Sequence, residues 1–380
     1  MKKTVMDGNM AAAWGVRLSD VKVVPNFPIT PQTELIETLA RWKVNGEWNG
    51  EFVNLEGEHS VMSAAIAAEA TGVRTFTASS SQGTLYMHEV MYVASGMRLP
   101  IVMVNVSRGL SAPITLWTDH NDMLAMRDSG WLMFFTHNNQ EVLDSIIQAY
   151  KISEDKNVML PTLINMEGFI QSYTREPVSI PDQKTVRKFL PKYKPHVVLN
   201  PDDPMCQGIG AMGKDYMKFR AQQHKAQLNA LKKIKDVGKE FGKVFGRSYG
   251  LVEKYKTDDA DFVFVSMGAL STTIKETVNR LRSEGKKVGL LRIRTYRPFP
   301  EKEIKKILKD VKTVAVIDNN VAPGYGGILY PEIKSALYGT DTIVSDFIVG
   351  LGGTHTGVSE FNSIYKNALK NKKSKRYWLL

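Results

Sequence analysis

The sequence predicts an α/β protein built on parallel sheets, and three observations lead to this class. Short apolar runs rich in β-branched residues recur through residues 1–170, and they return from residue 259 onward. Helix-length segments and short connections separate these runs, as in a parallel sheet covered by helices on both faces. The chain has 380 residues, 43% of them hydrophobic, which is enough to bury the cores of two domains.

The first part of the chain alternates strands and helices in order. Strands are expected at 21–24, 52–55, 74–79, 99–106, 131–135 and 160–166, where the residues are apolar and β-branched. Helices are expected between them at 31–43, 58–71, 82–95 and 140–153. The 58–71 segment is rich in alanine, which lets neighbouring backbones approach closely.

In the middle of the chain the alternation of strands and helices stops. An extended stretch there contains prolines at 177, 181, 191, 195, 201 and 204. A long basic helix follows at 213–245, and because its apolar positions are sparse, we expect it on the surface of a domain and outside any core. We therefore expect this region to connect two domains.

A second, smaller α/β domain follows the connector. Its strands are expected at 262–267, 287–294, 312–318 and 342–350, and its helices at 271–284, 300–309 and 327–338. The last residues form a basic tail with an aromatic end, which we expect to dock on a neighbour. We thus divide the chain into a first domain (1–175), a connector (176–257), a second domain (258–368) and a tail (369–380).

Composition excludes several classes of protein. The single cysteine, Cys206, rules out an internal disulfide framework and any cysteine-ligated iron–sulfur cluster held by this chain alone. No apolar run approaches the roughly 20 residues that span a bilayer, and no signal-peptide core follows the N-terminal lysines. We therefore expect a cytoplasmic protein that makes no contact with a membrane.

The net charge of +11 is unevenly spread. Residues 1–170 carry 12 lysines and arginines against 18 aspartates and glutamates, whereas residues 171–380 carry 38 against 21. Three roles are open for the basic half, in this order of preference: a solvated surface, contact with an acidic protein, and nucleic-acid binding. Aromatic residues are not interleaved with the basic ones, so we expect no nucleic-acid partner.

The stretch "VKVVPNFPITPQTE" (21–34) places three prolines at a strand-to-helix corner. Thr30 followed by Pro31 predicts a helix start, with the threonine as N-cap. A helix N-terminus at the carboxyl end of a parallel strand also attracts anions. Two roles for Thr30 thus stay open from the residues alone: capping the helix, and holding a small carboxylate.

Other polar residues also follow predicted strands. Glu58 opens the alanine-rich helix, where a carboxylate is favoured electrostatically for structural reasons as well. Gln82 lies in a corner of small residues that suits either a ligand or an ordinary turn. Arg108 comes directly after a buried strand and could bind a carboxylate bidentately. A long loop after it contains His120 and Asp122. No phosphate loop, zinc motif or nucleophile set is evident, so we expect no metal site.

Taken together, five motifs resemble the α subunit of the 2-oxoacid:ferredoxin oxidoreductases, the pyruvate enzyme above all. They are "NFPITPQTE", "EGEHSVMSA", "GVRTFTASSSQGTLYMHEVMYVASGMRLPIVM", "SRGLSAPITLWTDHND" and "RDSGW", and the likeness continues through "RIRTYRPFP" and "FIVGLGGTHT". The resemblance implies a thiamine diphosphate-binding fold, with a domain facing the aminopyrimidine followed by a transketolase C-terminal-like domain. The implied reaction is reversible, coenzyme A-dependent oxidative decarboxylation of a 2-oxoacid in anaerobic metabolism, with electrons passed to ferredoxin.

The resemblance also assigns roles to residues. Glu58 matches the glutamate that hydrogen-bonds N1′ of the aminopyrimidine and favours the reactive tautomer. Thr30 and Arg108 match the residues that hold the substrate carboxylate, so these three are the expected catalytic residues. His120 and Asp122 are implied near the substrate, and Ile29 and Gln82 near the cofactor.

The resemblance further implies that the chain is incomplete as a catalyst. The family's Mg²⁺ and diphosphate motif, a GDG run, is absent, and one cysteine cannot hold [4Fe–4S] clusters. Thiamine diphosphate would thus be shared with a partner subunit. Mg²⁺ and the clusters would belong to β-, γ- and δ-type subunits of a hetero-oligomer, which the basic half could contact.

The substrate is less sharply indicated. Gly57 and the aromatic tail "RYW" resemble the oxalate-specific branch of the family, but that branch replaces the threonine that Thr30 retains here. We therefore expect pyruvate, followed by 2-oxoisovalerate, an aryl glyoxylate and oxalate. A scaffold subunit without chemistry is the remaining alternative, although a scaffold needs neither Glu58 nor Arg108.

Overall fold

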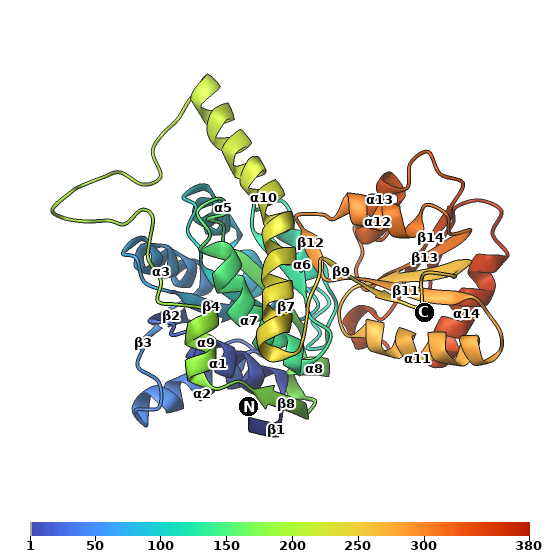
Figure 1. The fold of residues 1–380 in the computed structure, drawn as a ribbon, viewed down its shortest axis with the longest axis horizontal. Helices are drawn as coiled ribbons and strands as arrows, with labels where there is room; N and C mark the ends of the chain where they lie inside the picture. Colours follow the sequence, from blue (N-terminus) through green and yellow to red (C-terminus); the bar gives the residue numbers. More distant parts are fainter. Residues whose placement is uncertain (1) are drawn as a thin grey trace.

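The computed structural model describes residues 2–380, and it consists of two α/β units joined by an extended arm and a long helix (Figure 1). The first unit contains a parallel sheet in the order β3-β2-β4-β5-β7-β6, in which β2 meets β4 through a bridge between Val23 and Thr75. Its strands are β2 (Val23–Asn26), β3 (Glu51–Asn54), β4 (Phe76–Ser79), β5 (Val102–Ser107), β6 (Leu132–Phe135) and β7 (Thr162–Glu167).

Helices cover both faces of this first sheet. They are α1 (Gly8–Leu18), α2 (Thr33–Val44), α3 (Glu58–Ala70), α4 (Ser81–Tyr86), α5 (His88–Gly96), α6 (Asn121–Ala125), α7 (Asn139–Ser153) and α8 (Ile170–Tyr173). The central strands β4, β5, β6 and β7 are buried at every position, as their apolar composition predicts for strands with two covered faces.

The second unit has its own sheet, in the order β15-β14-β13-β10-β11-β9, parallel except for β9. Its strands are β9 (Val252–Tyr255), β10 (Phe262–Ser266), β11 (Val288–Ile293), β13 (Thr313–Asp318), β14 (Ile343–Ile348) and β15 (Arg376–Trp378). Its helices are α11 (Leu270–Ser283), α12 (Glu301–Leu308), α13 (Leu329–Ala336), a short 3₁₀ turn at Leu351–Gly353, and α14 (Val358–Leu369).

The expected α/β class with parallel sheets is confirmed, and most expected elements lie within two or three residues of their predicted bounds. The predicted helix at 82–95 is two helices, α4 and α5, which meet at Met87. Helices α1 and α14 were not predicted. The buried face of α1 consists largely of glycine and alanine, a composition that gives little amphipathic contrast.

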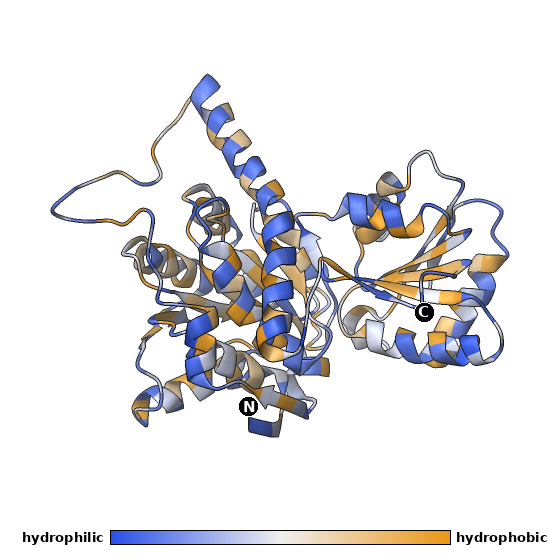
Figure 2. Ribbon diagram, in the orientation of Figure 1, coloured by the Kyte–Doolittle hydropathy of each residue, from blue (hydrophilic) through white to orange (hydrophobic). Residues whose placement is uncertain are grey.

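The connector is more structured than expected. Its strand β8 (Glu176–Ile180) pairs with the N-terminal strand β1 (Lys2–Met6), and helix α9 (Gln183–Phe189) precedes the arm. The prediction that helix α10 (Gly213–Phe245) lies on the surface and outside any core is wrong. Its later turns pack into the first hydrophobic core through Ala226, Ala230, Ile234, Val237, Phe241 and Phe245. Only its first turns stand clear of the body, where Figure 2 shows mostly hydrophilic residues.

The tail contains one further strand. Its residues Arg376–Trp378 form β15, which pairs in parallel with β14 of the same chain, and its docking on a neighbour stays a prediction. Tyr377 stacks on Phe347, with ring centroids 4.7 Å apart. The aromatic end of the tail therefore completes the second sheet.

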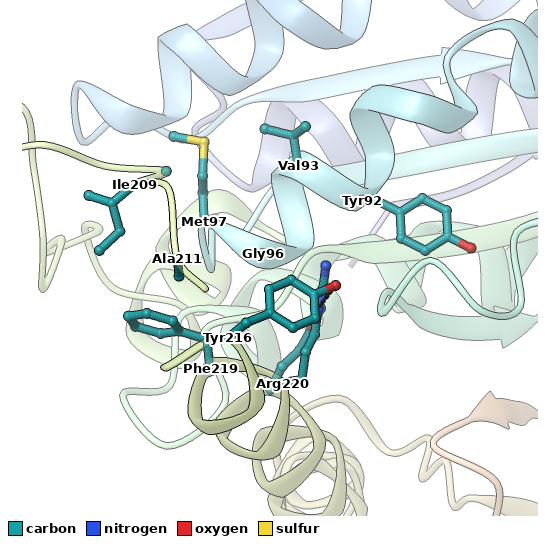
Figure 3. Close-up of a pocket in the computed structure, with 11 residues that line it drawn as sticks. Tyr92, Val93, Gly96, Met97, Ile209, Ala211, Tyr216, Phe219 and Arg220 are labelled. Atoms are coloured by element: carbon teal, nitrogen blue, oxygen red, sulfur yellow. Dashed lines mark hydrogen bonds between the residues drawn. The ribbon is translucent and has the colours of Figure 1, made fainter. Parts of the chain in front are cut away.

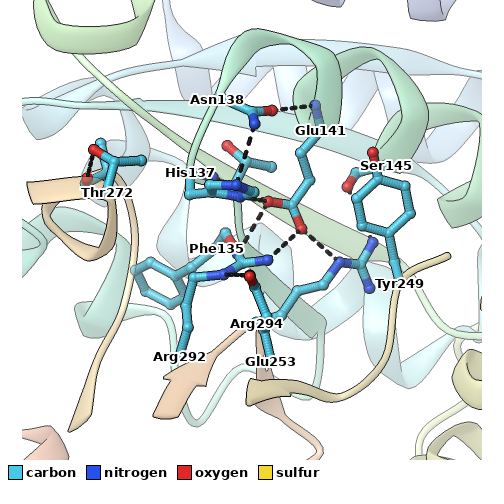
Figure 4. A network of polar contacts seen from close by, with 12 residues as sticks. Phe135, His137, Asn138, Glu141, Ser145, Tyr249, Glu253, Thr272, Arg292 and Arg294 are labelled. Atoms are coloured by element: carbon cyan, nitrogen blue, oxygen red, sulfur yellow. Dashed lines mark hydrogen bonds and ion pairs between the residues drawn. The ribbon is translucent and has the colours of Figure 1, made fainter. Parts of the chain in front are cut away.

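The two units share a strand and a buried ionic network. Strand β12 (Thr295–Arg297) belongs to the second half of the sequence, yet it pairs antiparallel with β6 at the edge of the first sheet. Beside it, the fully buried Glu141 of α7 accepts hydrogen bonds from Arg292 at 3.0 Å and Arg294 at 2.9 Å (Figure 4). Burial would raise the pKa of Glu141, but Arg292, His137 and Arg294 outweigh it and hold that pKa well below its usual range.

A pair of buried carboxylates lies in the second unit, at Asp318 and Asp346. They flank Gly327, where a Cβ would lie 2.1 Å from Asp318 Oδ2 and 2.6 Å from Asp346 Oδ1. Burial, followed by repulsion from Asp346, raises the pKa of Asp318 to about 7. An unfolded aspartate titrates near pH 4, so the folded state holds this proton more tightly. The pair consequently destabilises the fold increasingly as pH rises from about 4 to 7.

Replacing Asp346 with asparagine is therefore expected to raise the melting temperature at pH 8. The D346N variant removes one charge and offers an amide donor to Asp318, a gain of roughly 1–2 kcal/mol in the free energy of unfolding. At pH 5, where the native pair already shares a proton, the gain should largely vanish. Thermal unfolding at the two pH values checks this, and an equal shift at both would contradict the role of the shared proton.

Within residues 2–380, no helix combines the length and the apolar character required to cross a bilayer.

Candidate functional site

The polar residues that the sequence singled out gather at the carboxyl edge of the first sheet. Strands β2, β3, β4 and β5 run parallel, and each ends just before one of these residues. Thr30 follows β2, Glu58 follows β3, Gln82 follows β4 and Arg108 follows β5. In open α/β sheets, ligands bind in the crevice at this edge.

Arg108 joins two of these loops. Its side chain is only 8% exposed, Nη1 donates to the carbonyl oxygen of Thr30 at 2.7 Å, and Nη2 donates to Gln82 Oε1 at 3.1 Å. Burial lowers the pKa of Arg108, against the opposing effect of Asp122 and Glu58. An arginine remains a cation under such a shift, so the crevice holds one fixed positive charge.

Two buried donors in the crevice have no partner among the described residues. They are Arg108 Nε, from the loop after β5, and Gln82 Nε2, from the first turn of α4. Buried N–H groups are normally hydrogen-bonded, and leaving one unpaired is costly. Such donors beside a guanidinium charge suit a ligand that carries acceptor oxygens and a negative charge.

The corner before α2 differs from the predicted helix start. The helix begins at Thr33, and its N-cap is Gln32, so the prediction of Thr30 as N-cap is wrong. A turn closed by Gln32 N donating to Ile29 O at 2.9 Å comes first, and the Gln32 amide donates to Phe27 O at 3.0 Å and Ala78 O at 3.2 Å. Gln32 therefore anchors the corner.

This arrangement leaves the Thr30 side chain exposed at the crevice, while its carbonyl oxygen is bound to Arg108. Among residues 2–380, no group pairs with the Thr30 hydroxyl, which is thus available to a ligand. The neighbouring Ile29 is half-buried and accepts the turn hydrogen bond from Gln32 through its carbonyl oxygen.

Glu58 begins helix α3 as predicted, and its side chain is 7% exposed. The N-terminus of the helix favours a carboxylate there. No donor within the described part of the chain pairs with this carboxylate, so it is free to accept a hydrogen bond from a ligand. Gly83 makes room for it, because a Cβ at that position would lie 2.2 Å from Glu58 Oε1.

His120 and Asp122 are placed differently from the four crevice residues. His120 is 1% exposed, its Nε2 lies 3.0 Å from Glu167 Oε1, and its backbone N–H donates to Asn319 O of the second unit at 2.8 Å. It therefore packs between the two units. Asp122 is fully buried, and its carboxylate accepts backbone N–H groups beneath the crevice.

Two residues of this region were not singled out from the sequence. Ser81 has a left-handed backbone, with φ of 51°, and donates its N–H to Asp122 Oδ2 at 2.9 Å. Glu167, fully buried, accepts the backbone N–H of Ala269 at 2.7 Å and so ties the second unit to β7. A charged residue at the end of an apolar strand was the one available signal for Glu167, whereas nothing in a run of three serines indicates which of them is left-handed.

A separate hollow of about 420 Å³ lies between α5 and the start of α10 (Figure 3). Its walls are largely apolar, from Tyr92, Val93 and Met97 on one side and Ile209 and Phe219 on the other. It contains none of the crevice residues. Nowhere in residues 2–380 do three or more histidine, cysteine, aspartate or glutamate side chains form a group that could hold a metal ion.

Two family models match the chain, one to each unit. Residues 15–239 match the model described as pyruvate flavodoxin/ferredoxin oxidoreductase, thiamine diphosphate-binding. Residues 260–361 match pyruvate:ferredoxin oxidoreductase core domain II. The first match contains all the crevice residues.

Characterised relatives align over nearly the whole chain. Pyruvate synthase subunit PorA of Methanocaldococcus jannaschii is 47% identical, with 99% of this chain and 97% of the relative covered. PorA of Pyrococcus abyssi is 44% identical, with 99% and 98% covered. The ketoisovalerate oxidoreductase subunit VorA of Pyrococcus horikoshii is 46% identical, with 97% and 94% covered.

Solved structures share the fold at low sequence identity. A 2-oxoglutarate:ferredoxin oxidoreductase from Magnetococcus marinus, with 2-oxoglutarate, coenzyme A and succinyl-CoA bound, superposes with a TM-score of 0.77 at 17% identity. The alignment covers 97% of this chain and 65% of that one. A split-gene transketolase in an inactive β4 tetramer gives a TM-score of 0.56 at 13% identity, with 95% and 98% covered.

Proposed function

Since the chain belongs to the pyruvate:ferredoxin oxidoreductase family, we propose that its crevice binds pyruvate by the carboxylate, next to thiamine diphosphate held partly by Glu58. The chain is one subunit of a 2-oxoacid-oxidising enzyme complex that uses ferredoxin. The observation that carries the proposal is the pair of unpaired buried donors, Arg108 Nε and Gln82 Nε2, beside the guanidinium charge.

The crevice residues fit the cofactor as well as the substrate. Glu58 is a mostly buried carboxylate without a partner among the described residues, and it suits a ring N–H donor such as the imino tautomer of the cofactor's pyrimidine presents. Thiamine diphosphate, when bound, supplies the carbon nucleophile that attacks the 2-oxo carbon. Glu58 would accept the hydrogen bond that holds the reactive tautomer, and Ile29 would flank the ring.

Arg108, Gln82 and Thr30 would hold the substrate. Their donors come from three separate segments, and together they would fix the carboxylate and with it the adjacent 2-oxo carbon. Fixed charges and dipoles also cost little reorganisation during the reaction. His120 and Asp122 would act from behind these residues, since both are buried among protein groups.

The remaining parts of the reaction would come from partner chains. We assign Mg²⁺ and the diphosphate site to a β-type subunit and the [4Fe–4S] clusters to partner subunits of β, γ or δ type, which pass electrons to ferredoxin. Coenzyme A would accept the acyl group. The chain has a single cysteine, Cys206, and it is exposed. This count supports the assignment, since a [4Fe–4S] cluster takes four cysteine ligands.

A second candidate substrate is 2-oxoisovalerate, favoured by the 46% identity to a ketoisovalerate oxidoreductase subunit. The chain co-expressed with its partner subunits should be given thiamine diphosphate and coenzyme A, and viologen reduction followed with a panel of 2-oxoacids. We expect the highest kcat/KM with pyruvate. A preference for 2-oxoisovalerate would select the second candidate, and no reduction with any 2-oxoacid would overturn the proposed function.

A further inference from the structure

Asp122, at the start of α6, is a point where two loops of the crevice are tied together. Its side chain is completely buried, and Oδ2 accepts the backbone N–H of Ser81 at 2.9 Å and that of Arg108 at 3.1 Å. Oδ1 lies 3.1 Å from the Ser107 hydroxyl and 2.6 Å from the N–H of Met123. One carboxylate therefore accepts hydrogen bonds from the start of α4, from the end of β5 and the loop after it, and from its own helix.

The two tied backbone positions adjoin the carboxylate-binding side chains. One belongs to Arg108 itself, and the other belongs to Ser81, the residue before Gln82. Ser81 has φ of 51°, a left-handed conformation that a side chain disfavours and that surrounding contacts must hold in place. The Ser81 hydroxyl lies 2.6 Å from Gln82 Oε1 and 2.8 Å from Gly109 O, so it connects the same two loops again.

A buried polar layer supports the carboxylate from beneath. The Ser107 hydroxyl lies between Asp122 Oδ1 and Asn165 Oδ1, at 3.1 and 2.5 Å. The Asn105 amide donates to Asn165 Oδ1 at 3.2 Å, and Asn105 Oδ1 accepts the Thr84 hydroxyl of α4 at 2.6 Å. All five side chains are fully buried. This layer fixes Asp122 relative to β5, β7 and α4, which makes it a rigid reference for both loops.

We propose that Asp122 is a positioning residue that sets the spacing between Gln82 and Arg108, and thereby the geometry of the cradle for the substrate carboxylate. It acts through the backbone of Ser81 and Arg108 and does not contact the substrate. The inference rests on the proposed function of the crevice. By holding the backbone of Ser81 and Arg108, Asp122 would account for the 3.1 Å hydrogen bond from Arg108 Nη2 to Gln82 Oε1.

The test is the Asp122→Asn variant in the complete complex, assayed with pyruvate or, if another 2-oxoacid is preferred, with that substrate. The D122N side chain has one acceptor oxygen where four donors converge, and its NH₂ group faces an N–H or O–H. The two loops should therefore separate. We expect the KM for the 2-oxoacid and the inhibition constant of oxamate, a carboxylate-bearing isostere of pyruvate, to rise about 10- to 100-fold together. The thiamine diphosphate affinity should stay within about threefold.

Asp144→Asn is the matched control. Asp144 lies on α7 and is also a fully buried carboxylate. It accepts hydrogen bonds from Arg247 and Tyr249, each at 2.7 Å. D144N should lower the melting temperature without moving the KM or the oxamate constant. If D122N does not assemble, Ser107→Ala removes one contact to Asp122 and keeps its charge, and a two- to fivefold rise in both constants is expected.

The outcomes separate the two proposals. A wild-type complex that is inactive with every 2-oxoacid overturns the proposed function and this inference with it. An active wild-type complex whose D122N or S107A variant keeps its native KM and oxamate constant overturns the positioning role alone. Equal rises for D122N and D144N would also overturn it, since they would report a general loss of stability.

Discussion

Replacing Arg108 with alanine is expected to raise the KM for the 2-oxoacid by at least about 100-fold, which corresponds to roughly 3 kcal/mol of lost binding. The variant removes the fixed charge and the unpaired Nε donor, and it releases the contacts to Thr30 and Gln82. Thiamine diphosphate affinity should change by less than about threefold. Steady-state viologen reduction and cofactor titration of the complex provide the two measurements.

Arg98→Ala serves as the control for this variant. Arg98 is another partly buried arginine, but it donates to the backbone carbonyls of Val158 and Met159 near the start of β7, at the opposite edge of the sheet. R98A should cost stability and leave the KM unchanged. If R108A weakened cofactor and substrate binding equally, Arg108 would have a general structural role and not the proposed role at the carboxylate.

Replacing Glu58 with glutamine is expected to lower kcat by about 10²- to 10³-fold, within the range that a positioned proton acceptor contributes. The substitution keeps the volume of the side chain beside Gly83, where space is tight. It removes the negative charge and the capacity to hold a proton at the carboxylate. The KM for the 2-oxoacid should stay within a few-fold, because the carboxylate cradle is built by other loops.

Glu69→Gln is the matched control on the same helix. Glu69 lies at the far end of α3, is 2% exposed, and accepts the backbone N–H of Thr75 at 2.9 Å. Burial raises the pKa of Glu69, so its charge is already costly in the folded state. E69Q should leave kcat near the native value. Nearly native turnover by E58Q would rule out the proton-holding role of Glu58.

The strand ends could be predicted from sequence because each crevice residue comes within four residues of the end of a strand. Arg108 comes immediately after β5, and the carboxyl ends of parallel strands meet at one edge, so its position next to Gln82 and Glu58 follows from topology. The assignment of chemistry depended on five motifs in order, since "EGEH" or "ITPQ" alone is compatible with ordinary helix starts.

The errors came from interactions between distant residues. Nothing local indicates that the Gln32 amide reaches Ala78, 46 residues away, or that the helix begins at Thr33 with Gln32 and not Thr30 as N-cap. The same holds for helix α10, whose sparse apolar residues fall on one stripe and pack into the core of the first unit. The proposed tethering role of Asp122 has no sequence signal either, because it acts through backbone N–H groups that every residue type except proline possesses.

Strand β12 has a consequence for how the chain can be divided. Residues 295–297 follow four elements of the second unit in the sequence but close the edge of the first sheet against β6, whose four residues are all buried. A fragment that ends in the connector would leave this apolar strand with an open edge, the kind of surface through which sheets aggregate. The first unit therefore depends on a strand from the second half of the chain, and we expect a fragment without residues 295–297 to aggregate.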